Sequence, residues 1–303
     1  MNRRSFINNS LLSMGSIAAL GFEGLAAPSF VADEQFELTV LATNWGFKGD
    51  FDAFCAAAKA DGFDGIEVWL PGIGARRDSL FAALKKYDLS FGLLAGVGEN
   101  DFKTHFDRFQ RALNTAVEQK PLYVNCHSGR DFFSFSENAQ IIRYANELSK
   151  SSGVPIYHET HRGRILFAAH ICRQFLEEIP ELRLTLDISH WTNVHESLLE
   201  NQQETVSLAL GRTDHIHARI GHQEGPQVTD PRAPEWENAV KAHFAWWDEI
   251  VALKSKAKQN LTVLTEFGPP NYLPTVPYTQ QPLADQWGIN VHMMHAFRER
   301  YLG

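Results

Sequence analysis

Cysteine is scarce in this chain. The 303 residues include three cysteines, Cys55, Cys126 and Cys172, which are far apart in the sequence. An odd number of widely spaced cysteines excludes a disulfide framework and a zinc knuckle built on cysteine pairs. We therefore expect three isolated, buried thiols, because free cysteine behaves as a small apolar side chain.

A block of basic residues is also missing. The formal net charge is −8, with 28 Lys and Arg against 36 Asp and Glu. Binding of nucleic acid without sequence preference depends on basic groups that neutralise phosphates. A DNA- or RNA-binding role is therefore disfavoured, whereas the 44% of hydrophobic residues suffices for a folded globular domain.

The first 32 residues have the layout of an export signal. Arg3 and Arg4 precede Ser5, a short apolar stretch follows over residues 11–20, and small residues come at 25–27. The paired arginines resemble the twin-arginine signal of bacteria. The apolar stretch is shorter than the ~20 residues of a stable membrane span. We expect residues 1–32 to direct export to the periplasm, with an uncleaved anchor or a disordered leader as the alternative, and residues 33–303 to form one domain.

From Phe36 onward, short β-rich apolar runs alternate with longer helical patterns. The expected strands are Leu38–Thr43, Gly65–Leu70, Ser90–Ala95, Leu122–Cys126, Pro155–Glu159, Arg183–Asp187, His215–Arg219 and Leu261–Glu266. The expected helices are Phe51–Asp61, Asp78–Tyr87, Phe102–Glu118, Ser136–Lys150, Leu166–Glu178, His195–Leu210, Glu235–Ala257 and Ala284–Tyr301. Eight such units predict an α/β fold, a single (β/α)8 TIM barrel with parallel strands. A doubly wound open sheet is the competing fold, but the first strand lacks the Gly-rich turn typical of it.

Four of these strands end in a side chain that can bind metal. The fifth to eighth strands carry Glu159, Asp187, His217 and Glu266 near their C-terminal ends. In a barrel these ends meet at one face, where active sites lie. Three carboxylates that converge there repel one another unless a cation stands among them. The set therefore predicts one divalent metal ion, with Mn²⁺ or Mg²⁺ favoured by the oxygens and Co²⁺ or Zn²⁺ admitted by the imidazole.

Further polar and aromatic residues fall near the same strand ends and are candidates for substrate contact. They are His127, His161, His190, Arg219, Glu67 and Trp45, with Trp69 as a second aromatic candidate. Imidazole, guanidinium and carboxylate groups can bind sugar hydroxyls, and an indole ring can stack on a sugar face. Ordinary packing at the barrel mouth is the alternative for each of them. Two long loops, residues 221–234 and 268–283, are expected to roof a pocket.

The pattern of these residues resembles the xylose isomerase-like barrel superfamily of sugar isomerases, sugar epimerases, inosose dehydratases and endonuclease IV. The motif runs through Glu159, Asp187-x-x-His190, His215-x-His217 and Glu266, and the segments Asn125–Gly129, His158–Arg164 and Thr265–Pro270 are similar to bacterial proteins called sugar phosphate isomerase/epimerase. By resemblance to the D-tagatose 3-epimerase branch, Glu159 and Glu266 would bind the metal and exchange substrate protons, and His190 would contact the sugar.

The sequence departs from the families that it resembles at three places. Ketose epimerases place an acidic residue six positions after the strand-five glutamate and an arginine six after the strand-seven histidine, where this chain has Ile165 and Gln223. Their contacts to substrate are therefore not inherited. Endonuclease IV has an Asp-x-His pair after strand seven, whereas this loop has Asp230-Pro231-Arg232, which disfavours DNA repair.

These observations favour a metal-dependent enzyme that removes a proton next to a carbonyl of a sugar or polyol, with one glutamate removing the proton and the other returning it. The first alternative is a dehydratase or hydratase of a keto-sugar or inosose. The second is an exported carbohydrate-binding barrel without catalysis. The expected partner is a small carbohydrate, with no nucleic acid and no stable membrane span. The oligomeric state is left open.

Overall fold

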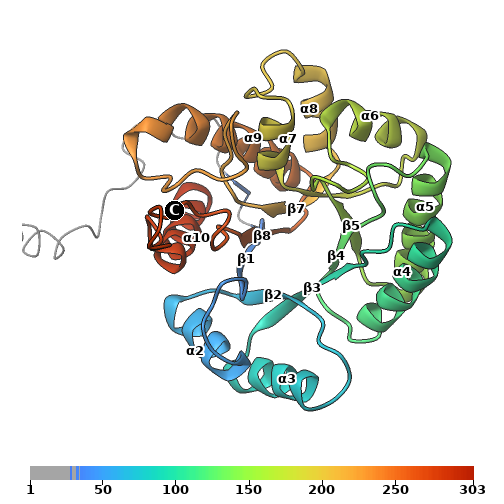
Figure 1. Ribbon diagram of the computed structural model, residues 1–303, viewed down its shortest axis with the longest axis horizontal. Coiled ribbons are helices and arrows are strands. Elements are labelled where there is room, and N and C mark those ends of the chain that lie inside the picture. The colour runs from blue at the N-terminus through green and yellow to red at the C-terminus, as the bar shows by residue number, and fades with distance from the viewer. Residues whose placement is uncertain (1–27, 29–31, 34) are drawn as a thin grey trace, which may run out of the picture.

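A closed barrel of eight parallel strands forms the centre of the computed structural model, which describes residues 28, 32–33 and 35–303 (Figure 1). The strands run in sequence order around the barrel, and β1 pairs with both β2 and β8. Their bounds are β1 Leu38–Thr43, β2 Gly65–Trp69, β3 Ser90–Gly96, β4 Val124–His127, β5 Ile156–Glu159, β6 Leu184–Leu186, β7 Thr213–His217 and β8 Leu261–Thr265. The predicted TIM barrel is thus confirmed.

Helices surround the barrel in Figure 1 and cover the outer faces of its strands. They are α2 Phe51–Asp61, α3 Ala75–Tyr87, α4 Phe102–Val117, α5 Phe135–Ser152, α6 Ala169–Glu178, α7 Ile188–Val194, α8 Gln203–Leu210, α9 Glu237–Lys256 and α10 Gln286–Tyr301, with a 3₁₀ turn η1 at Pro234–Trp236. Within the described part of the chain, every helix is too short or too polar to cross a bilayer.

Side chains that end the connecting loops determine where several helices begin. Asp50 and Asp101 cap α2 and α4 by accepting the amides of Ala53 and Thr104. These bonds satisfy amides that the first helical turn leaves without a partner. The strands are near-continuous apolar runs because both of their faces are buried, one by the barrel interior and one by the helices. The three cysteines are free and buried, as expected.

The sixth predicted helix, His195–Leu210, is wrong in its extent. The structure has two helices there, α7 directly after β6 and α8 at Gln203–Leu210. Asp187 caps α7 by accepting the amide and hydroxyl hydrogens of Ser189, so the helix begins before His190. Glu196 and Leu199 then take positive φ values and interrupt the helical path. The seventh strand also ends earlier than predicted, at His217, which leaves Arg219 in the following loop.

The barrel interior has an apolar layer below the strand ends. Leu41, Tyr123 and Leu264 form a small buried cluster there, with Tyr157 packed against it. These side chains come from β1, the segment before β4, β8 and β5. The polar side chains of the site come later along the strands, toward their C-terminal ends.

The α9 helix is tied to the loop after β7 by a buried histidine whose pKa makes stability depend on pH. His243 accepts the amide of Gly221 through Nε2 (3.2 Å) and donates from Nδ1 to the Ala239 carbonyl (2.8 Å). Burial lowers the pKa of His243 from about 6.5 to about 4. Between pH 6.5 and pH 4, His243 is protonated in the unfolded chain but stays neutral in the folded chain. The free energy of unfolding therefore falls as the pH drops from 6.5 toward 4.

We expect wild type to lose about 2 kcal/mol more unfolding free energy than His243→Asn between pH 7 and pH 5. Urea unfolding at the two pH values measures this difference, and asparagine retains a hydrogen-bond donor near the Nδ1 position. An equal loss in both proteins would show that His243 is not a source of the acid sensitivity.

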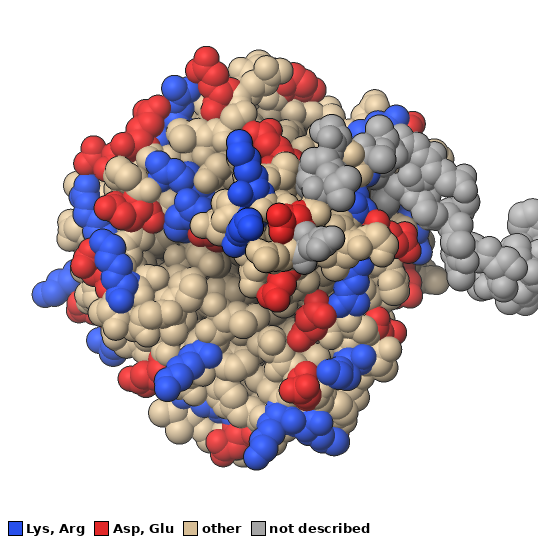
Figure 2. Space-filling view, turned by 180° about the vertical axis from the view of Figure 1, so that it is seen from behind, with Lys and Arg blue, Asp and Glu red and all other residues tan. Residues whose placement is uncertain are grey.

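The surface carries mixed charge. Figure 2 shows acidic and basic side chains interspersed over the described part of the face opposite to that of Figure 1. The predicted export signal at residues 1–32 lies almost entirely outside the described residues, so it stays a prediction.

Candidate active site

Four side chains from the C-terminal ends of four consecutive strands converge at that end of the barrel. They are Glu159, Asp187, His217 and Glu266, and one potential ligand atom of each lies within 4.8 Å of the others. All four residues are buried. The structure thus brings together the metal ligands that the sequence predicts, although they come from elements up to about 100 residues apart.

Polar atoms that make no hydrogen bond within this cluster fit a bound cation. Glu159 Oε1, His217 Nδ1 and Glu266 Oε2 are buried and make no hydrogen bond to the described residues, although His217 Nδ1 lies 3.0 Å from Glu266 Oε2 and 3.7 Å from Glu159 Oε1. Buried polar atoms without a hydrogen bond are costly. Two carboxylate oxygens and one imidazole nitrogen are a donor set suited to a divalent metal ion. We call these four residues the carboxylate–histidine cluster.

Arg219 adds a permanent positive charge beside the cluster. Its guanidinium pairs with Asp187 Oδ2 and lies 3.5 Å from Glu266 Oε2. The side chain is almost completely buried, and it also stands over the ring of Tyr272 at 4.6 Å. Asp187 therefore caps α7, pairs with Arg219 and is one of the four candidate metal ligands.

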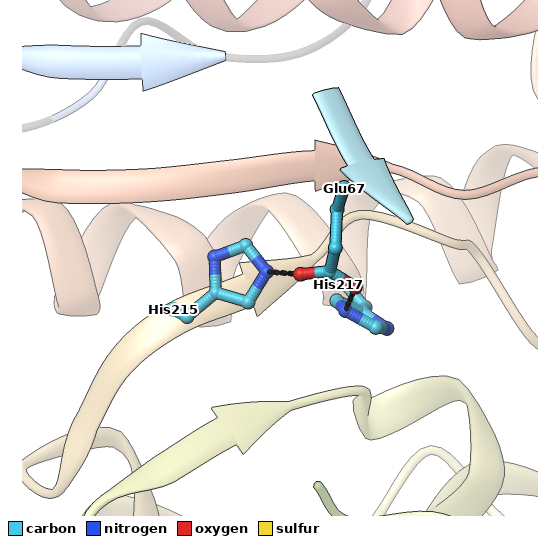
Figure 3. A group of neighbouring side chains, drawn as sticks. All are labelled: Glu67, His215 and His217. Carbon is cyan, nitrogen blue, oxygen red and sulfur yellow. Dashed lines mark hydrogen bonds and ion pairs between the residues drawn. The ribbon is translucent and has the colours of Figure 1, made fainter. Parts of the chain in front are cut away.

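A fourth carboxylate, Glu67 on β2, contacts both His217 and His215 of β7 (Figure 3). Glu67 Oε1 is 3.1 Å from His217 Nε2, and Glu67 Oε2 is 3.1 Å from His215 Nε2. The Tyr123 hydroxyl also donates to Glu67 Oε2 (2.7 Å). A carboxylate at this position holds a hydrogen on His217 Nε2, which leaves Nδ1 as the nitrogen that faces the cluster.

The pKa values reflect a buried excess of negative charge. Burial raises the pKa of Asp187 to about 6, although Arg219 opposes the rise. Burial alone would lower the pKa of His217, but the carboxylates of Glu266, Glu159 and Glu67 raise it well above its usual range. A metal ion would supply the balancing charge without a proton on His217.

A cavity of about 380 Å³ opens above the cluster. Its lining includes Thr43, Asn44, Trp45, Gly46, Trp69, Leu94, His127, His161, Arg219, Glu266 and Tyr272. The volume falls in the usual range of small-molecule sites. Of the residues predicted to contact substrate, Trp45, His127, His161 and Arg219 face this cavity.

The predicted substrate contacts His190 and Glu67 lie deeper. Both are fully buried, and the described lining of the cavity does not include them. His190 Nε2 is 2.9 Å from the Arg219 guanidinium, and its ring packs against His161 at 4.1 Å. His127 Nε2, in contrast, lies 2.8 Å from Glu159 Oε2 at the edge of the cavity.

Sequence reasoning missed two residues of the site. Tyr272 comes from the proline-rich loop after β8, where no periodicity shows which side chain turns inward. Asn125 donates to Glu159 Oε2 (2.8 Å) from β4, and alternation from His127 could have identified it. The loop after β7 supports the roof from outside, because Gln227 exchanges two hydrogen bonds with the backbone of Gly268.

Solved structures with this fold include several sugar enzymes. One is 3-keto-D-glucoside 4-epimerase from E. coli, 13% identical, with a TM-score of 0.56 over 86% of this chain and 99% of that one. A D-tagatose 3-epimerase-like protein is 12% identical, with a TM-score of 0.57 over 88% and 98% of the chains. A probable 3-DHS dehydratase from Bacillus anthracis is 17% identical, with a TM-score of 0.54 over 86% and 98%. At these identities the likeness shows the fold alone.

The sequence has no significant match among curated proteins. A family model described as xylose isomerase-like TIM barrel matches residues 55–231, which is more than half of the chain. The match covers the segment from α2 to the loop after β7 and so includes three of the four residues of the carboxylate–histidine cluster. The chain therefore belongs to the xylose isomerase-like TIM barrel family.

Proposed function

We propose that this protein is a metal-dependent isomerase or epimerase that moves a proton next to a carbonyl of a sugar or polyol. The observation that carries the proposal is the carboxylate–histidine cluster at the floor of the cavity, with three buried potential ligand atoms that make no hydrogen bond. The fold shared with sugar epimerases supports it.

Glu159, Asp187, His217 and Glu266 would hold one divalent ion, with Mn²⁺ or Mg²⁺ favoured by the three carboxylates. When bound, such an ion polarises a substrate carbonyl and acidifies the neighbouring C–H group. The protein's own part is to fix the ligand positions through Glu67 and the cap of α7, and to keep water from the floor of the cavity.

Glu159 and Glu266 are the proposed proton carriers. Glu266 keeps part of its carboxylate in the cavity, with 11% of the side chain exposed. Glu159 accepts one hydrogen bond from Asn125 and lies against His127, and these two contacts orient its carboxylate. Because the two glutamates belong to strands on either side of His217 and Asp187, one can remove a proton and the other can return it.

Replacing one ligand tests the metal site. Asp187→Asn retains an oxygen for the α7 cap but removes the charge, and we expect the purified variant to lose most of its bound metal. Elemental analysis of wild type, Asp187→Asn and Asp52→Asn provides the measurement. The last variant is the control, since Asp52 is an exposed carboxylate paired with Lys86. Stoichiometric metal in Asp187→Asn would contradict the ligand assignment.

The reaction type is tested in D₂O with a panel of keto-sugars, keto-glycosides and inososes. An isomerase or epimerase incorporates deuterium at carbon and leaves the composition of the substrate otherwise unchanged. A change of 18 daltons in the product would instead identify a dehydratase or hydratase. Binding without any turnover would favour a carbohydrate-binding protein.

We further propose that residues 1–32 direct export through the twin-arginine route, as the pair Arg3 and Arg4 indicates. Fractionation of the tagged full-length chain should place wild type in the periplasm and the double variant Arg3→Lys, Arg4→Lys in the cytoplasm. If both proteins stay in the cytoplasm, the export proposal is wrong.

A further inference from the structure

We infer that the cavity binds an uncharged sugar, one without phosphate or carboxylate, whose ring lies against Trp45 and Trp69. The inference rests on the proposed function and narrows it to a substrate class. It differs from what the name sugar phosphate isomerase/epimerase, carried by similar bacterial proteins, suggests for them.

The lining of the cavity offers little free positive charge. Arg219 is the one Arg or Lys among the described residues that line the cavity. Its guanidinium is already engaged by Asp187 and Glu266, and its face is covered by the Tyr272 ring. Binding of a phosphate group requires charge-assisted hydrogen bonds. The positive charge of Arg219 is already compensated by two carboxylates, so its guanidinium would bind a phosphate only weakly.

The cavity also contains negative charge. The Glu266 carboxylate is part of the lining and would repel a phosphate bound in the cavity. A divalent ion and Arg219 together bring three positive charges, which equal the charges of Glu159, Asp187 and Glu266. The occupied site therefore has no excess positive charge, and a phosphate dianion would meet cationic groups that are already balanced by carboxylates.

One side of the cavity is aromatic and is formed by Trp45 and Tyr272. Trp45 packs edge-on against Tyr272, with ring centroids 5.0 Å apart, and Gln286 donates to its backbone carbonyl. Gly268 makes room for the indole, because a Cβ at that position would lie 2.3 Å from the Trp45 ring. Trp45 is thus held in place and still 36% exposed.

Trp69 extends this aromatic wall in the other direction around the barrel. It ends β2, packs edge-on against His127 of β4 (5.2 Å) and is 48% exposed. The cavity therefore has a polar side from β5 to β8 and an aromatic side from Tyr272 through Trp45 to Trp69. A neutral sugar has a matching division, with hydroxyl groups on its edge and C–H groups on its ring face.

Binding can be measured separately from turnover. The probes are D-fructose with D-fructose 6-phosphate and D-glucose with D-glucose 6-phosphate, titrated into the Mg²⁺-loaded enzyme and followed by saturation-transfer NMR. We expect each uncharged sugar to bind at least tenfold more tightly than its phosphate. Trp45→Ala and Trp69→Ala should each weaken binding of the uncharged sugars severalfold. The control Phe132→Ala removes an exposed aromatic ring outside the described lining and should have no effect.

A variant with one added positive charge should shift the preference in the opposite direction, toward the phosphorylated sugars. Asn44→Arg would place an unpaired guanidinium in the lining, and we expect it to improve binding of the phosphates relative to the uncharged sugars. Wild-type enzyme that binds the phosphates as tightly as the uncharged sugars, or binds none of the uncharged sugars, would overturn the inference. Deuterium exchange into phosphorylated sugars but not into uncharged sugars would also overturn the inference, while leaving the proposed function intact. Uncharged sugars that bind without any exchange would support the inference and count against the proposed function.

Discussion

Glutamine at position 159 or 266 is expected to lower kcat about 10²- to 10⁴-fold, the usual contribution of a positioned acid or base. Glutamine retains the size and one oxygen of glutamate but cannot accept or return a proton. Glu159 and Glu266 both face the carboxylate–histidine cluster, within 4.8 Å of the other members. Each would contact the substrate carbon from its own side, so loss of either interrupts the overall reaction.

Two measurements separate loss of proton transfer from loss of metal. Elemental analysis gives the metal content of each variant, and NMR in D₂O follows exchange at the substrate carbon. With metal still bound, a single variant should retain exchange through the remaining glutamate yet form no epimer. Unimpaired epimerisation in either metal-loaded variant would show that the replaced glutamate does not carry protons.

The barrel itself was predictable from short-range pattern. Apolar runs of five or six residues alternate with helical segments, and most strand bounds differ from the structure by one or two residues. The error at His195–Leu210 has a specific cause, because Asp187 is both a strand-end residue and a helix cap. A pattern of apolar residues does not show which of the two a single aspartate will be.

The cluster was predictable because parallel strands bring their ends to one face, whatever their distance in sequence. The position of Arg219 between Asp187 and Glu266 was not, since it depends on the path of the chain after β7 ends. The inward direction of Tyr272 depends in the same way on the fold of a proline-rich loop. Both are set by tertiary contacts that leave no periodic signal in the sequence.

Glu67 shows a further limit of pattern-based reasoning. Alternation along β2 places its side chain inside the barrel, but alternation does not give depth along the barrel axis. The structure places Glu67 against His217 and His215, at 0% exposure and outside the described lining of the cavity. Burial alone would raise the pKa of Glu67, but His217 and His215 hold it below its usual range, so the carboxylate stays ionised there.

This position makes Glu67→Gln a strong test of how the site is held. Partners that orient a metal-bound histidine are worth about 10- to 100-fold in metal affinity. Glutamine keeps an oxygen that can face His217 Nε2, and His215 can adapt by donating from Nδ1 to the Thr262 carbonyl, 3.0 Å away. The fold should therefore survive, while His217 loses the negative charge that makes its Nδ1 a better ligand. We expect metal affinity to fall about 10- to 100-fold.

Competition with a metal chelator measures the affinity, and the absorption spectrum of the Co²⁺-loaded protein reports the ligand geometry directly. Glu178→Gln is the matched control, because it removes an exposed carboxylate paired with Arg143 on the outer helices. Urea unfolding of both variants shows whether the fold is intact. If Glu67→Gln binds metal within twofold of wild type and keeps its Co²⁺ spectrum, Glu67 does not orient His217. In that case the polar neighbours of Glu67 would serve only to stabilise a buried carboxylate in the barrel interior.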